Sequence, residues 1–286
     1  MHRTADGIRG DPTIRLAERE RQRPEWRSWL TMLSQVARAL EDPRWQTPLP
    51  DGEPGERAAG SVEGVPLLHL RRLKVDAGAA QGLVRDLASA ADGSLRRYRP
   101  SAQDAVGLIT AAVRQDSDGF RALAAGVGID GGALSAVAHL ASLPLLQSCG
   151  RVLGSRLPRF WPDGYCPVCA AWPLLVEQRG IDRSRQLRCG RCAVEWEAQW
   201  LCCVYCGERD HQRLGSLVPE DGGEVLKVEI CHTCGGYLKS VATLQRIPAF
   251  ELLLRDLETV ELDLVAVDRG HGRPEGAGFP LEVGPA

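Results

Sequence analysis

The hydrophobic and polar positions divide the chain into a helical first half and a second half without helical periodicity. From Trp26 to Leu40, apolar residues recur at three- and four-residue intervals. Pro24 precedes this run at a first-turn position, and Pro43 ends it. Similar runs continue as far as Leu143. Apolar helix faces must bury against one another, so the spacing predicts four to six helices joined by short links, a helical bundle.

Local signals mark where several of these helices begin and end. Asp76 is expected to cap one helix, and Ser101 with Asp104 resembles a capping box at the start of the next. Pro144 is expected to kink or end the last helix, because proline lacks the backbone N–H that the helix needs. Residues 46–65 are rich in proline and glycine and are expected to form a surface loop.

After about residue 159 the pattern changes to short β-like segments. Candidate strands are Leu174–Val176, Val194–Trp200 and Val225–Ile230. An apolar stripe after Pro248 predicts a terminal helix, although Val260–Ala266 also alternates as a strand would. The pattern predicts four parts: a helical domain at 1–157, a β-rich module at 158–247, a C-terminal helix at 248–270 and a disordered Gly/Pro-rich tail at 271–286.

Eight of the ten cysteines occur as four Cys-x-x-Cys pairs within the β-rich module. Two thiolates on one tight turn can face one ion, and a second such turn completes a tetrahedral shell of four sulfurs. Interleaved pairing and thioredoxin-like redox dithiols are the alternatives, but no pair opens a βαβ unit. The simplest pairing predicts two metal sites, each holding one Fe or Zn ion: Cys166, Cys169, Cys189 and Cys192 in the first, and Cys203, Cys206, Cys231 and Cys234 in the second.

The remaining thiols and nearby histidines are not expected to bind metal. Cys149 lies in an apolar helical run and is interpreted as a small buried hydrophobe. Cys202 precedes Cys203 and would point to the opposite face of an extended segment. Because four sulfurs are already present for each site, His211 and His232 are interpreted as neighbours of the sites and not as ligands.

Charge and composition limit the classes of binding partner and the cellular location that we expect. The formal net charge of the 286 residues is −2, so nothing general favours nucleic acid or an anionic membrane surface. The first ten residues are charged, without the apolar core of a secretory signal, and no apolar run approaches the roughly twenty residues of a membrane span. Metal-binding free thiols without an export signal predict a cytoplasmic protein.

Catalytic signatures are missing from the sequence. It contains no G-x-S-x-G, no glycine-rich phosphate loop and no H-E-x-x-H motif. A metal ion held by four cysteines also has no open coordination position for a substrate. We therefore expect a binding protein and not an enzyme.

Five segments of the chain match a known pattern: Cys166–Cys169, Cys189–Cys192 with Glu195 and Trp196, Cys203–Gly207, Glu229–Lys239 and Asp256–Ala266. Together they resemble the formate dehydrogenase accessory protein FdhE family. The resemblance implies a helical N-terminal domain followed by paired rubredoxin-like modules, and hence an α+β fold with two rubredoxin-like or zinc-ribbon modules and a C-terminal helix. It also implies a cytoplasmic accessory protein that binds the formate dehydrogenase catalytic subunit and does not itself catalyse turnover.

Some positions depart from the family pattern. Glu197 stands where a histidine is expected, Trp200 where a basic residue is usual, and Cys202 replaces another polar or basic residue. Ala170 replaces the glycine expected after the first knuckle. All eight paired thiols are kept, so the departures affect the expected partner contacts along Trp196–Cys202 and leave the metal sites unchanged.

Three functions are compatible with these features: an assembly factor for formate dehydrogenase, a nucleic-acid-binding zinc ribbon, and a rubredoxin-like iron electron carrier. Residues 160–246 contain ten Lys or Arg and eleven Asp or Glu, a balance of −1, whereas a phosphate-binding ribbon should be clearly positive. Five arginines between Arg179 and Arg191 leave a local basic hairpin open. The electron carrier requires iron, because zinc has no accessible redox change. The resemblance favours the assembly factor.

Overall fold

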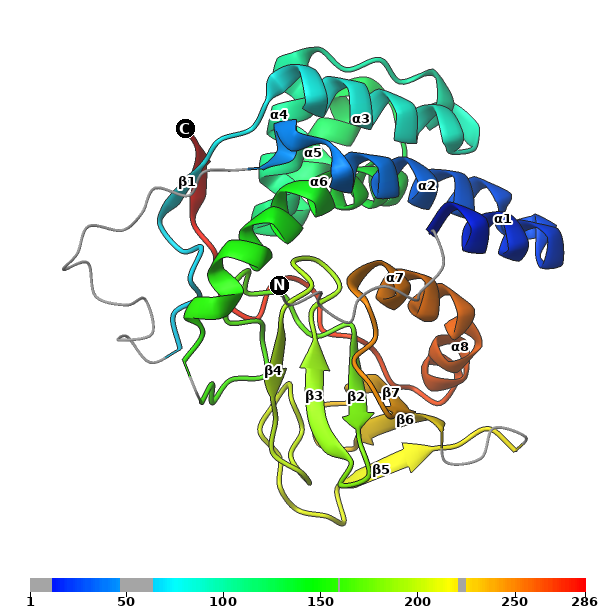
Figure 1. The fold of residues 1–286 in the computed structure, drawn as a ribbon, viewed down its shortest axis with the longest axis vertical. Coiled ribbons are helices and arrows are strands. Elements are labelled where there is room, and N and C mark those ends of the chain that lie inside the picture. Colours follow the sequence, from blue (N-terminus) through cyan, green and yellow to red (C-terminus); the bar gives the residue numbers. More distant parts are fainter. Residues whose placement is uncertain (1–11, 47–63, 159, 221–224) are drawn as a thin grey trace, which may run out of the picture. The chain divides into compact units, whose positions relative to one another are not determined.

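The computed structural model describes residues 12–46, 64–158, 160–220 and 225–286. The described chain forms two compact units (Figure 1). The helical unit comprises residues 12–46, 75–112 and 118–144, and the cysteine-bearing unit comprises residues 64–74, 113–117 and 145–286. The domain boundaries expected at 157, 247 and 270 remain a prediction. The loop predicted at 46–65 falls almost wholly outside the described residues.

The first half of the chain is helical, as predicted. Apolar positions along the predicted helices are buried, including Leu30, Val36, Leu83 and Ile109. Short 3₁₀ turns at Pro24–Trp26 (η1), Pro43–Trp45 (η2), Gly93–Arg97 (η3) and Gly154–Arg156 (η4) adjoin the helices. The helices are α1 (Pro12–Gln22), α2 (Arg27–Glu41), α3 (Ala77–Ala90), α4 (Ala102–Arg114), α5 (Ser117–Val127) and α6 (Gly131–Leu153).

Two predicted helix caps are confirmed. The Asp76 carboxylate accepts a 2.7 Å hydrogen bond from the backbone N–H of Ala79 at the start of α3. At the start of α4, the Ser101 hydroxyl accepts from the Asp104 N–H at 3.1 Å, and the Asp104 carboxylate accepts from the Ser101 N–H at 3.0 Å. These reciprocal bonds form the capping box that the sequence indicates.

Helix α6 passes through Pro144 and continues to Leu153, so of the two outcomes expected at this proline, a kink or an end, the end does not occur. An internal proline costs about 3 kcal/mol. Burial of Leu143, Leu145 and Leu146 around the proline opposes that cost. The segment Gly131–Arg156 is also long and apolar enough to cross a membrane, contrary to the expectation that no apolar run approaches that length. However, 67% of its apolar window is buried in the protein, as in a core helix.

The second half forms one six-stranded sheet instead of two separate β-modules. The strands are β2 (Leu175–Arg179), β3 (Ser184–Arg188), β4 (Glu195–Glu197), β5 (Leu214–Leu217), β6 (Leu226–Cys231) and β7 (Tyr237–Thr243). Their order in the sheet is β4-β3-β2-β7-β6-β5. Two antiparallel three-stranded meanders, one for each half of the cysteine region, join where β2 pairs in parallel with β7 (Figure 1). The α+β fold class is confirmed.

Two helices cover one face of this sheet, where the sequence predicts a single C-terminal helix. They are α7 (Ala249–Glu258) and α8 (Val260–Asp268), drawn in orange in Figure 1. Leu252 of α7 packs with Leu175 and Val241, and Ala266 of α8 packs with strands β6 and β7. Helix α7 ends at Thr259, which separates it from α8 and whose hydroxyl donates to the Arg255 carbonyl at 2.8 Å.

The tail contains a short strand, where the sequence predicts disorder for 271–286. Its strand β8 (Val283–Pro285) pairs in parallel with β1 (Arg71–Leu73). Leu281 and Val283 are each only 4% exposed, and Arg114 donates through Nε to the Val283 carbonyl at 2.8 Å. The glycine and proline content suggested disorder. Two buried apolar side chains and a strand partner more than two hundred residues earlier favour order instead.

Candidate metal centres

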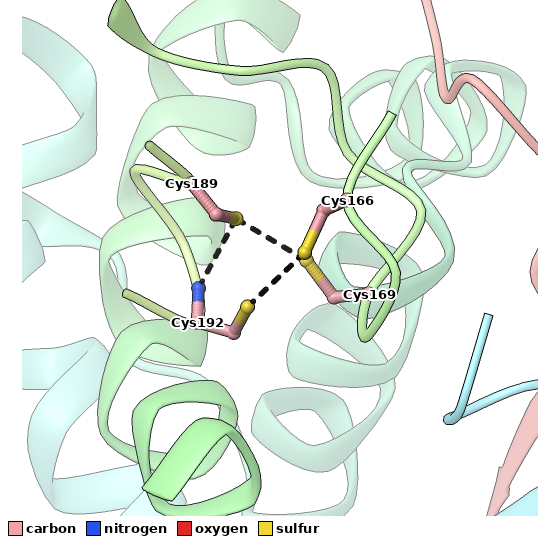
Figure 2. Close-up of side chains that lie close together, drawn as sticks. All are labelled: Cys166, Cys169, Cys189 and Cys192. Carbon is pink, nitrogen blue, oxygen red and sulfur yellow. Dashed lines mark hydrogen bonds between the residues drawn. The ribbon is translucent and has the colours of Figure 1, made fainter. Parts of the chain in front are cut away.

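The first cluster consists of the thiols of Cys166, Cys169, Cys189 and Cys192. The first pair lies in the loop before β2 and the second pair directly follows β3, so the β2–β3 hairpin brings the two turns face to face (Figure 2). The Sγ atoms of Cys166 and Cys192 are 3.4 Å apart, as are those of Cys169 and Cys189. All four sulfurs lie within 4.8 Å of one another.

The second cluster consists of the thiols of Cys203, Cys206, Cys231 and Cys234. Cys203 and Cys206 precede β5, Cys231 ends β6, and Cys234 lies in the turn before β7. The Sγ atoms of Cys203 and Cys234 are 3.7 Å apart, as are those of Cys206 and Cys231. The structure thus groups the eight sulfurs into two successive sets of four, which is the simplest of the pairings that the sequence left open.

Both clusters have the dimensions of a four-sulfur metal site. Sulfurs bound tetrahedrally at about 2.3 Å from an ion lie about 3.8 Å from one another. The separations of 3.4 and 3.7 Å are close to that value. Within the described residues, neither cluster contains a histidine or a carboxylate, and His211, His232, Cys149 and Cys202 lie outside both. Each cluster could therefore hold one ion in a closed shell.

Each knuckle turn uses a left-handed residue directly after its second cysteine. That residue is alanine in the first cluster, with φ of 63° at both Ala170 and Ala193. In the second cluster it is glycine, at Gly207 and Gly235. Left-handed backbone costs a non-glycine residue roughly 1–2 kcal/mol. Replacement of glycine by Ala170 therefore keeps the turn at a modest cost.

The first cluster is sealed by segments from elsewhere in the same unit. Two carbonyls of its first knuckle, those of Pro167 and Val168, accept hydrogen bonds from the N–H groups of Leu67 and Leu68 at 2.8 and 3.0 Å. The Ala170 carbonyl accepts from the N–H of Gly278 in the tail at 2.9 Å. All four of its cysteines are at most 1% exposed.

The second cluster is open on one side. Cys206 and Cys234 are exposed, whereas Cys203 and Cys231 are buried. The tail contacts this cluster at the turn of its last knuckle, where the Gly272 N–H donates to the Gly235 carbonyl at 2.9 Å. The two clusters therefore offer the same ligands in different surroundings, one dry and one accessible from the surface.

Burial affects the thiol pKa values. It raises the pKa of Cys166 and of Cys192 well above the ordinary value, while hydrogen bonds from the neighbouring thiols hold the pKa of Cys169 well below it. Burial also raises the pKa of Cys149 to about 12, which fits an inert thiol. In the second cluster, burial raises the pKa of Cys203. A buried group of four thiolates needs a counter-charge, and a divalent cation would supply it.

The structure also places charged residues beside the first cluster that the sequence did not single out. Arg188, directly before Cys189, is fully buried and pairs with the equally buried Glu177. Burial lowers the pKa of Arg188 to about 10. Glu177 also accepts from Arg179 at 2.6 Å and from the Ile247 N–H at 3.1 Å. Their sequence positions resemble ordinary surface charges, so no pattern in the chain marks them.

Comparisons with known proteins agree with this arrangement. No family model matches the chain. The FdhE homologue of Stutzerimonas stutzeri (strain A1501) is 38% identical over 111 residues, which is 38% of this chain and 35% of that protein. FdhE of Escherichia coli O127:H6 is 32% identical over 111 residues, again 35% of its length. The matched part of the chain thus spans about a third of the length of these curated relatives.

The structural similarity to FdhE covers more of the chain than the sequence similarity does. The crystal structure of the FdhE protein from Pseudomonas aeruginosa superposes with a TM-score of 0.56, covering 96% of this chain and 95% of that one, at 22% sequence identity. The fold and the two thiol clusters define an α+β protein with two tetracysteine sites. The curated relatives, over about a third of their length, and the shared fold agree with the resemblance to the FdhE family found in the sequence.

Proposed function

We propose that each cluster binds one metal ion, Fe or Zn, and that the protein is a cytoplasmic accessory factor for formate dehydrogenase that docks onto the catalytic subunit. The observation that carries this proposal is the pair of four-thiol groups on one sheet, in a chain similar to FdhE proteins. The ions would be held by the eight clustered cysteines and would fix the turns between strands.

A docking role agrees with the chemistry of the sites. A four-cysteine shell leaves no coordination position for a substrate, so the ion contributes shape and rigidity to the surface around it. The balance of −1 over residues 160–246 suits protein contacts better than phosphate binding. The protein is therefore proposed to bind its client and not to turn over a substrate.

The accessible second cluster favours electron transfer as a second candidate function. An ion beside the exposed Cys206 and Cys234 would lie close to a bound redox partner. This function requires iron, because zinc has no accessible redox change. Metal analysis and a visible spectrum of anaerobically purified protein distinguish the two metals.

The docking function predicts a specific complex in the cell. The tagged protein should copurify with the formate dehydrogenase catalytic subunit, and deletion of its gene should abolish formate oxidation while the transcript of that subunit is unchanged. Copurification followed by mass spectrometry, together with an activity assay, tests this. A protein that ignores the dehydrogenase but binds DNA with a steep salt dependence would contradict the proposal and favour the nucleic-acid function.

Metal release should follow the exposure of the two clusters. We expect an excess of chelator to remove the ion of the second cluster well before that of the first, because Cys206 and Cys234 are exposed and the thiols of the first cluster are sealed. Alkylation during chelation, read by mass spectrometry, should label Cys206 and Cys234 before Cys166 and Cys169. Simultaneous labelling of both sets would show that the seal around the first cluster does not protect its ion.

A further inference from the structure

The loop between β4 and β5 presents large apolar side chains to solvent. Trp200 is 49% exposed and Leu201 is 65% exposed. Leu201 also has a left-handed backbone, with φ of 51°, which a branched apolar residue rarely adopts. Strained backbone persists where the surrounding structure holds it, and it is common at binding sites. The loop thus holds an apolar side chain outward at a conformational cost.

A cavity of about 260 Å³ lies beside these two side chains. Its walls come from the loop and from strands β5, β6 and β7, and they include the buried cysteines Cys203 and Cys231 of the second cluster. The volume is slightly below the roughly 300 Å³ at which small-molecule sites usually begin, so it suits an inserted side chain better than a cofactor. The apolar residues of its lining are Trp200, Leu201, Val204, Tyr205, Leu214, Ile230, Tyr237 and Leu238.

The charges around the cavity indicate which charged group the occupant would carry beside its inserted side chain. Arg185 donates to Glu229 at 2.6 Å and to the Gln199 carbonyl at 2.9 Å, so the positive and negative charge of this pair balance. Lys227 adds one further positive charge to the lining. A carboxylate on the occupant would be attracted to it.

The neighbouring strand suits an extended occupant. Strand β5 contributes Leu214, Gly215 and Ser216 to the cavity, and among the described residues it is the edge strand of the sheet, paired with β6. An extended peptide can lie along such an edge while alternate side chains enter a pocket.

We propose that this loop and cavity form the docking site for an extended segment of the formate dehydrogenase catalytic subunit. The segment would insert one large apolar side chain between Trp200, Leu201 and the sheet, and would place a carboxylate near Lys227. This inference rests on the proposed function and gives it a location. Because Cys203 and Cys231 form part of the cavity wall, a filled second cluster shapes the site.

Another exposed apolar pair supplies a matched control. Ile181 is 97% exposed and Leu244 is 79% exposed, beside a separate hollow at the ends of β2 and β7. No cluster cysteine lines that hollow. A charged residue at Ile181 therefore replaces a more exposed apolar side chain than one at Leu201, but away from the proposed site.

The test measures the affinity of the metal-loaded full-length protein for the purified catalytic subunit from the same cell. Leu201→Glu should weaken binding about tenfold or more, as expected for a central apolar anchor. Lys227→Glu should weaken binding less and should reduce its dependence on salt. Ile181→Glu should bind within about twofold of the unchanged protein. Two metal ions per chain and an unchanged melting temperature would show that each variant is folded.

A second measurement uses the unchanged protein. Cys202 is half-buried, belongs to neither cluster and lines the same cavity, whereas the eight cluster thiols would be protected by metal. Iodoacetamide should label Cys202 in the free protein and label it much more slowly in the complex. If the subunit binds but Leu201→Glu and Cys202 labelling show no effect, the docking site is wrong and the proposed function stands. If the unchanged protein does not bind the subunit, the proposed function itself is wrong.

Discussion

Replacing Cys169 with alanine is expected to remove the ion of the first cluster and to disrupt much of the six-stranded sheet. The first cluster is buried and joins the loop before β2 to the end of β3. Structural zinc sites contribute apparent binding free energies of about 10–16 kcal/mol, far more than a small β-module gains from its apolar core. Because β2 pairs with β7, the loss should spread into the half of the sheet that carries the second cluster.

The measurements are metal content per chain and circular dichroism. We expect a fall from two ions to one or fewer, with loss of the near-ultraviolet signal while most of the far-ultraviolet helical signal remains. The helical unit keeps its own buried residues, such as Val36 and Val84. Cys202→Ala is the control and should keep both ions, because Cys202 belongs to neither cluster. Equal loss of metal in both variants would show that the cluster assignment is incomplete.

The grouping of the cysteines could be predicted because it depends on local sequence. A Cys-x-x-Cys turn and a hairpin of about twenty residues bring their own ends together, so spacing alone favours two successive groups of four. The caps at Asp76 and Ser101 are predictable for the same reason, since each satisfies N–H groups a few residues away.

The joining of the two β-modules could not be predicted from the same patterns. The parallel pairing of β2 with β7 connects Leu175 to Lys239 and Arg179 to Thr243, and alternation within a strand does not specify a partner so far along the chain. The tail illustrates the same limit. Its order depends on pairing with β1 and on the fit of Gly278 against Tyr165, where an added Cβ would lie 2.3 Å from the Tyr165 Cβ.

The buried charges are the second feature that the sequence could not reveal. The ten basic and eleven acidic residues of 160–246 give a net charge near zero. A net charge does not show which of the charged side chains are buried. In the structure, Glu177 and Arg188 have fully buried side chains. Lys239 is 1% exposed and pairs with Asp256 at 2.6 Å and with Asp263 at 2.7 Å. Charged residues are rarely fully buried unless paired, and the pairs form between different elements.

Glu177→Ala is therefore expected to be among the most destabilising substitutions outside the clusters. Glu177 accepts hydrogen bonds from Arg188, from Arg179 and from the Ile247 N–H, so it connects β3, its own strand and the segment before α7. Without it, the buried Arg188 keeps only Glu195, 3.6 Å from its Nε, as a nearby carboxylate. Removal of one partner from a buried ion pair costs about 3–5 kcal/mol, because the remaining charge stays out of water.

Urea denaturation of the metal-loaded protein measures this cost. We expect Glu177→Ala to lower the free energy of unfolding by about 3–5 kcal/mol. Glu197→Ala, which removes an exposed carboxylate from β4, should change it by less than about 0.5 kcal/mol. The double variant Glu177→Ala with Arg188→Met should recover part of the loss, because no charge of that pair is then left buried without its partner. A Glu177→Ala protein as stable as the unchanged one would mean that Arg188 finds compensation elsewhere, through Glu195 or through water that enters beside the first cluster.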